Sequence, residues 1–143
     1  GYRDRITRDK LKMLRGASCE ESVLGMMLLY PEYIKSSLDG DDGAPQREDF
    51  MTQFGQRVFD AITGIYRENG SFDFGALSAE FSLDEVSRLT KLMQSRSGLD
   101  NSPAVFKGTV AALRTEGERE KEKKLDAFDA IMRRRKKNTD EGQ

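Results

Sequence analysis

The chain has 143 residues, of which 36% are hydrophobic and 34% are charged. This composition supplies one modest core beneath a heavily solvated surface. The 24 basic and 25 acidic side chains nearly cancel, which argues against a chain-wide nucleic-acid-binding surface. Histidine is absent and Cys19 is the only cysteine, so we exclude a disulfide framework, a His/Cys zinc site and any histidine-dependent nucleophile.

Helical patterns dominate the first third of the chain. Ser18 and Glu21 form a capping box in front of the apolar run Val23–Leu29, which is apolar around most of its circumference. Such a helix is typical of the centre of a bundle. A short second helix is predicted over Pro31–Leu38, because proline suits a first helical turn. Residues 39–45 are a loop by composition.

Three more helices are predicted before the arm, each from its terminal signals. Thr52 caps the first of them, and Gly70 provides its left-handed stop. Asp73 caps a short helix, and Ser82 with Glu85 forms the capping box of the next. The apolar residues expected to face the core are Phe54, Val58, Ile62, Ile65, Val86, Leu89 and Met93.

The last helix changes character along its length. Ser102 caps it and Pro103 opens it, and Phe106, Val110 and Leu113 recur on one face. From Arg114 through Lys124 there is no aliphatic or aromatic residue, which is typical of a helix that leaves the body and crosses solvent. We expect a bend at Gly117 and an interhelical turn over residues 138–142.

Beyond this polar stretch lies a second apolar face, followed by the basic run Arg133–Lys137. The face cannot reach the main core unless the arm folds back. Its partner is therefore a missing hairpin helix, another copy of the chain, or a different protein. The basic run could contact phosphates, favour the negative end of the arm helix, or meet an acidic protein surface. The candidate partner-binding residues are Leu125, Phe128, Ile131, Met132, Arg133, Arg134 and Arg135.

No other cluster predicts chemistry. The aspartates of the 39–45 loop lack the later ligands of an EF-hand, since Gly43 and Phe50 stand there, and no strand precedes them as in a magnesium-dependent polymerase. The glycines match no phosphate loop, and Gly64 is expected to mark close helix packing. Cys19 is interpreted as a small buried hydrophobe rather than a reactive thiolate. We expect no catalytic, cofactor-binding or metal-binding residue, and no enzyme activity in this chain.

The predicted fold class is all-α, a compact helical bundle followed by a long charged arm. We assign residues 1–16 to a linker or an added segment, 17–113 to the bundle, and 114–143 to the arm. The arm is interpreted as the first half of a terminal helical hairpin that has been cut short. No apolar run could span a bilayer and no signal peptide opens the chain, so we expect a cytoplasmic protein without a membrane partner. Because no aromatic stacking platform accompanies the basic run, direct nucleic-acid binding should be weak or absent.

Several segments resemble two related bacterial replication modules. The stretch Glu20–Glu32 is similar to the opening helix of these modules. Later parts of the modules are similar to Glu48–Phe50, Arg57–Ile62 and Gly70–Leu77. One module is the N-terminal domain of the DnaB-type replicative helicase. The other is the C-terminal helicase-binding domain of the DnaG-type primase, which shares that helical fold. The resemblance covers roughly Cys19 to Leu113.

The arm favours the primase domain, because residues 136–141 resemble the turn of the primase's terminal helical hairpin. The resemblance implies a protein-interaction domain that binds the N-terminal domain of the replicative helicase. It brings the primase, a DNA-directed RNA polymerase, to the replication fork for primer synthesis and modulates the helicase. In some relatives, single-strand DNA-binding protein is a further partner. The alternative is the helicase's own N-terminal collar domain, which self-associates, whereas we expect a monomer or a weak dimer.

Overall fold

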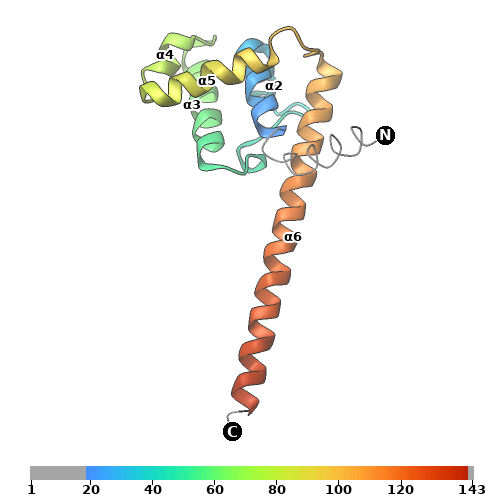
Figure 1. Ribbon diagram of the computed structural model, residues 1–143. Coiled ribbons are helices and arrows are strands. Elements are labelled where there is room, and N and C mark those ends of the chain that lie inside the picture. Colours follow the sequence, from blue (N-terminus) through green and yellow to red (C-terminus); the bar gives the residue numbers. More distant parts are fainter. Residues whose placement is uncertain (1–18, 142–143) are drawn as a thin grey trace, which may run out of the picture.

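The computed structural model describes residues 19–141, which are helical apart from short turns and contain no strand. A first helix over residues 19–29 packs at the centre of a bundle, and the last helix projects from that bundle as a rod (Figure 1). The bundle and arm of the predicted all-α fold are confirmed. The predicted cap Ser18 lies outside the described residues. The later elements are α2 (Glu32–Leu38), the 3-10 turn η1 (Arg47–Asp49), α3 (Gln53–Asn69), α4 (Phe74–Ser78), α5 (Leu83–Arg96) and α6 (Pro103–Glu141).

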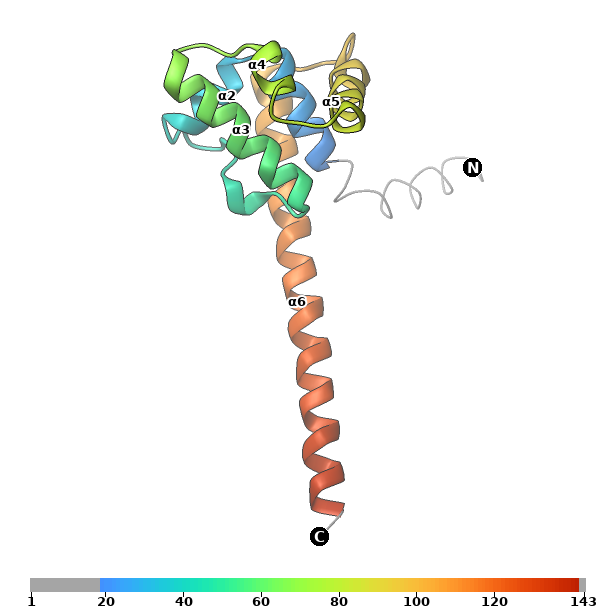
Figure 2. The ribbon, with the colours of Figure 1, turned by 90° about the vertical axis from the view of Figure 1, so that its left-hand side faces the viewer.

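The first helix is the centre of the core, as its apolar circumference predicts. Side chains on several of its sides are completely covered, because α3, α5 and the first turns of α6 surround it. Figure 2 shows these helices gathered at one end of the molecule, with the rest of α6 extending away from them. The most deeply buried core residues are Val23, Leu24, Met26, Met27, Ile34, Phe50, Val58, Ile62, Leu77, Leu89, Val110 and Leu113.

The predicted helix ends are confirmed at four places. The Thr52 hydroxyl accepts the Gly55 amide, and the Asp73 carboxylate accepts the Gly75 amide. Ser82 and Glu85 form a complete capping box at α5. Gly70 ends α3 with φ of 70°, a left-handed conformation that glycine adopts without a steric cost.

The buried carboxylate of Glu20 ties the first helix to the start of α3. Its side chain is only 4% exposed. It accepts hydrogen bonds from the Met51 amide at 2.6 Å, the Thr52 amide at 3.1 Å and the Thr52 hydroxyl at 2.6 Å. A Cβ added at Gly55 would lie 2.7 Å from the Glu20 carboxyl carbon, so the glycine provides the space for this carboxylate.

Close helix packing occurs at Gly25 and not at Gly64. A Cβ on Gly25 would lie 2.5 Å from the Leu92 carbonyl oxygen, which brings the first helix against the backbone of α5. No atom of the described residues lies within 4 Å of the corresponding position on Gly64. The interpretation of Gly64 as a packing glycine was wrong, because that side of α3 faces open space.

The base of α6 is fixed against α2. The Tyr33 ring stacks on Phe106 with centroids 4.1 Å apart and planes 4° apart. The Tyr33 hydroxyl donates a hydrogen bond of 2.5 Å to the Asn101 carbonyl, and its burial raises the pKa of this phenol above the ordinary value. These contacts anchor both the loop before α6 and its first turns.

The arm is one uninterrupted helix. The predicted bend at Gly117 and the predicted turn over 138–142 were wrong for the described part, since α6 runs from Pro103 to Glu141. A glycine costs about 1 kcal/mol in a helix, and strong helix formers surround this one. Ion pairs between Arg119 and Glu116 and between Lys123 and Glu120 add to α6.

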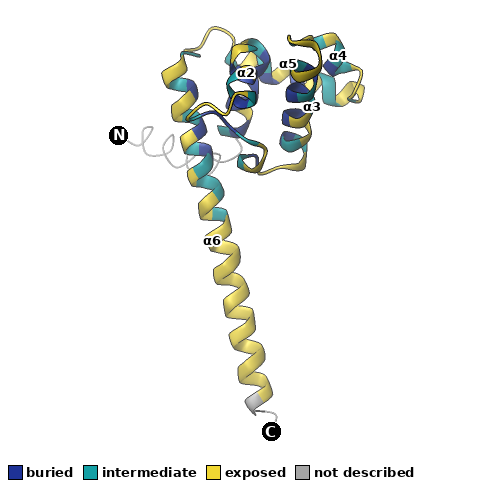
Figure 3. Ribbon diagram, turned by 180° about the vertical axis from the view of Figure 1, so that it is seen from behind, coloured by how far each residue is buried: buried dark blue, intermediate teal, exposed yellow. Residues whose placement is uncertain are grey.

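The arm leaves the body later than the polar stretch suggests. Arg114, Glu116, Gly117 and Glu120 are still partly covered. Every side chain over residues 121–139 is exposed, as the uniform yellow of the lower rod in Figure 3 shows. The free arm therefore begins about two helical turns beyond Leu113.

Two glycine substitutions should have opposite effects on stability. Gly25→Ala should lower the free energy of unfolding by about 1–3 kcal/mol, because its methyl group would overlap the Leu92 carbonyl. Gly64→Ala should raise it by about 0.5–1 kcal/mol, because alanine favours the helix and meets only open space. Denaturant unfolding followed by circular dichroism measures both. A stabilising Gly25→Ala would show that the first helix and α5 are farther apart than described.

Removing the Glu20 carboxylate should destabilise the bundle. Glu20→Ala leaves the Met51 and Thr52 donors without their acceptor, so we expect a loss of about 3 kcal/mol in the free energy of unfolding. Glu68→Ala is the control, because that carboxylate is exposed on α3 and its loss should change stability by less than about 0.5 kcal/mol. Equal effects of the two substitutions in denaturant unfolding would contradict this role of Glu20.

Candidate docking surface

The four predicted apolar residues of the arm lie together on one side of α6. Leu125 is 63% exposed, Phe128 59%, Ile131 51% and Met132 47%. Their spacing of three and four positions places them on adjoining turns. No other element of the described residues covers them, so α6 presents a continuous apolar face, which we call the arm face.

The three arginines predicted to bind a partner do not all lie on the arm face. Successive helical residues are rotated by about 100° around the axis, so the side chains of Arg133, Arg134 and Arg135 point to different sides. Arg135 lies four positions after Ile131 and seven after Phe128, and therefore continues the arm face. Arg133 and Arg134 lie on other sides of α6. All three side chains are exposed.

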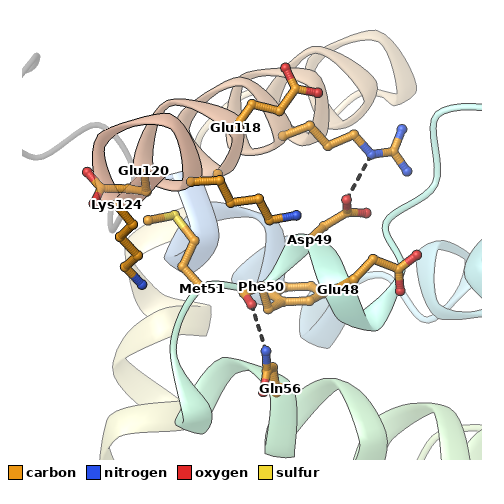
Figure 4. A pocket seen from close by; sticks show the side chains of 11 residues that line it. Glu48, Asp49, Phe50, Met51, Gln56, Glu118, Glu120 and Lys124 are labelled. Atoms are coloured by element: carbon orange, nitrogen blue, oxygen red, sulfur yellow. Dashed lines mark hydrogen bonds and ion pairs between the residues drawn. The ribbon is translucent and has the colours of Figure 1, made fainter. Parts of the chain in front are cut away.

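A hollow of about 390 Å³ lies where the arm leaves the body, and sequence reasoning did not find it. One wall comes from η1 and the residues that follow it, and the other from α6 (Figure 4). Residues far apart in the sequence form it, so helical periodicity carries no signal for it. Its lining residues are Glu48, Asp49, Phe50, Met51, Gln56, Arg114, Gly117, Glu118, Glu120, Lys121 and Lys124.

An ion pair sets the geometry of this hollow. The Arg114 guanidinium donates to Asp49 Oδ1 at 3.1 Å and to the Ala44 carbonyl at 2.8 Å. The Asp49 side chain is largely covered, so this pair is better shielded from solvent than the other ion pairs of α6. Arg114 therefore holds α6 against η1 about two helical turns before the exposed part of the arm begins.

The other candidate clusters offer no comparable surface. Among residues 19–139, no group of three histidine, cysteine or carboxylate side chains could hold a metal ion, and no described helix could cross a membrane. Cys19 is half-buried and packs against the core. Two pKa shifts of charged groups have local causes. The hydrogen bond that Glu85 accepts from Arg57 lowers the pKa of Glu85, and the hydrogen bond that Lys35 donates to Asp39 raises the pKa of Lys35.

Truncating the arm face should leave the bundle intact. Phe128→Ala should change the melting temperature of the bundle by no more than about 1 °C, because the side chain is outside the core. Phe106→Ala is the contrasting variant and should cost about 3–5 kcal/mol, since that ring is buried against Tyr33. Thermal unfolding by circular dichroism compares them. A large loss for Phe128→Ala would mean that the arm packs on the body in solution.

Comparison with known proteins identifies the fold of the bundle. The family model described as the DnaB-like helicase N terminal domain matches residues 13–107, which is more than half of the chain. The match covers the bundle up to the first turns of α6, and the arm face lies beyond it. No curated protein and no solved structure matches the chain. The chain belongs to the family of DnaB-like helicase N-terminal domains.

Proposed function

We propose that this chain is the helicase-binding domain of a bacterial DNA primase. It docks on the N-terminal domain of the replicative helicase, recruits the primase to the replication fork for primer synthesis, and modulates the helicase. The observation that carries the proposal is the arm face: four large apolar side chains stand exposed on a rod that projects from a bundle of this family. In this proposal the chain acts by binding, and the chemistry of primer synthesis belongs to other domains.

The proposed mechanism is the docking of helices. Burying a large apolar side chain contributes about 1.5–3 kcal/mol before ordering costs. A micromolar complex needs about 8 kcal/mol. Leu125, Phe128, Ile131 and Met132 are about half exposed, so burying them supplies part of this free energy, and further contacts supply the rest. Because the replicative helicase is a hexamer, repeated sites would add avidity for linked primase domains.

A second candidate function is the N-terminal collar domain of the helicase itself. The family match favours it, because that family is described by the helicase domain. A collar domain assembles with copies of itself, whereas a primase domain binds the helicase as a separate chain. Size-exclusion chromatography with light scattering therefore distinguishes the candidates: the primase proposal predicts a monomer or a weak dimer, and the collar proposal predicts a stable oligomer.

A binding titration tests the primase proposal directly. Labelled chain is titrated with the N-terminal domain of the replicative helicase of the same organism, and fluorescence anisotropy reports the complex. Phe128→Ala should weaken binding by about tenfold or more, because it removes a central anchor.

Leu83→Ala is the control for that titration. Leu83 is 90% exposed but lies on the bundle, at the start of α5. Its loss should leave the affinity within about twofold. Absence of binding by the unmodified chain would overturn the primase proposal, and so would equal losses for the two variants.

A further inference from the structure

The chain that precedes the first helix enters the bundle beside the hollow. The first helix begins at Cys19, and the carboxylate of Glu20 accepts the Met51 amide at 2.6 Å. Met51 in turn lines the hollow between η1 and α6. An extended residue spans at most about 3.6 Å, so the five residues before Cys19 can reach about 18 Å. The hollow is therefore within reach of the segment that leads into the first helix.

The hollow exposes apolar surface between its polar groups. Met51 is 42% exposed on one wall, and the aliphatic stems of Lys121 and Lys124 add apolar surface to the other. Figure 4 shows Met51 and Lys124 on the two sides of this space. No atom of the described residues lies within 4 Å of a Cβ built on Gly117, which leaves the α6 wall open there. Apolar side chains from elsewhere can therefore enter between the walls.

The charges of the hollow favour neither a basic nor an acidic occupant. Four carboxylates and three cations line it. Asp49 pairs with Arg114, and Glu120 pairs with Lys123 just outside the lining. The lining groups without an ion pair among residues 19–139 are two carboxylates and two lysines, namely Glu48, Glu118, Lys121 and Lys124. The hollow therefore suits apolar side chains that are flanked by charges of both signs.

We propose that Leu11 and Leu14 of the same chain fill this hollow. Their spacing of three would place both on one side of a helical turn. Asp9 precedes them and Arg15 follows, so the segment combines two large apolar side chains with charges of both signs. The contact would fasten the segment before the first helix across the place where α6 leaves the bundle. This inference does not depend on the proposed function.

The short connection favours this occupant over a separate molecule. A ligand on a short flexible connection has an effective concentration in the millimolar range, so a modest apolar contact fills the site. The occupants considered for the arm face are a hairpin helix, a second copy and a different protein. A helix lying along α6 would cover Met132 of the arm face together with Met51. The two leucines would cover Met51 alone.

Oxidation of methionines by hydrogen peroxide tests this inference on the full chain. Met51 and Met132 are 42% and 47% exposed, so they should react at similar rates if no other segment covers either. Coverage by the two leucines should make Met51 react at least about threefold more slowly than Met132. Mass spectrometry of tryptic peptides separates the two, because Met51 lies in residues 48–57 and Met132 in residues 125–133.

Two double variants of the same segment identify the covering side chains. Leu11→Ser with Leu14→Ser should remove the protection of Met51 and bring its rate to within about twofold of the arm methionine. Lys10→Ser with Lys12→Ser is the matched control, because it shortens two neighbouring side chains and keeps both leucines. The control should leave the protection of Met51 unchanged. Circular dichroism verifies that both variants keep their helix content.

The remaining outcomes overturn the inference. Equal rates for Met51 and Met132 in the unmodified chain would show that the hollow is open. Slow reaction of both methionines would indicate a helix along α6, and protection that increases with protein concentration would indicate a second copy. Protection that survives the leucine substitutions, or that is lost equally in the lysine variant, would contradict an apolar contact by the two leucines. None of these results bears on the proposed function, because the experiment contains no helicase domain.

Discussion

The Glu20 carboxylate is the contact on which the arrangement of the bundle depends. It lies at the start of the most buried helix and takes up two amides and a hydroxyl at the entrance to α3. A buried charge is tolerated only when its oxygens are hydrogen-bonded, and Gly55 leaves the space for that geometry. Because the chain from η1 into α3 is fixed in this way, Asp49 and Met51 are placed where α6 passes them.

The arm face gains its direction from contacts near the body. Tyr33 stacks on Phe106 at the beginning of α6, and Arg114 binds Asp49 about two turns later. Between them Val110 and Leu113 are fully buried. These contacts hold the first part of α6 over several turns, so its continuation presents Phe128 and its neighbours at a defined position relative to the bundle. In the proposed function, a partner would therefore meet a preorganised surface, which would reduce the ordering cost of binding.

Local sequence patterns predicted most of the helices and their ends, but they did not predict the contacts between segments that are distant in the sequence. The caps Thr52, Asp73 and Ser82 follow from residue type and position alone, and all three occur. Gly25 and Gly64 look alike in the sequence, and only the position of α5 shows which one packs closely. The hollow depends on η1 lying beside α6, and no periodicity encodes that approach. The prediction of a bend at Gly117 was wrong, because it considered the low helix propensity of glycine without the helix-forming residues around it.

The unbroken course of α6 gives the molecule a mechanical property. With no hinge between the bundle and Arg135, α6 acts as a stiff lever of about 33 Å beyond Leu113. A tilt of about 10° where Arg114 meets Asp49 would move the tip by about 6 Å, roughly the pitch of one helical turn. Small rearrangements at the Arg114–Asp49 contact would therefore produce large displacements at the far end of α6. A force applied to that far end would act on the Arg114–Asp49 ion pair.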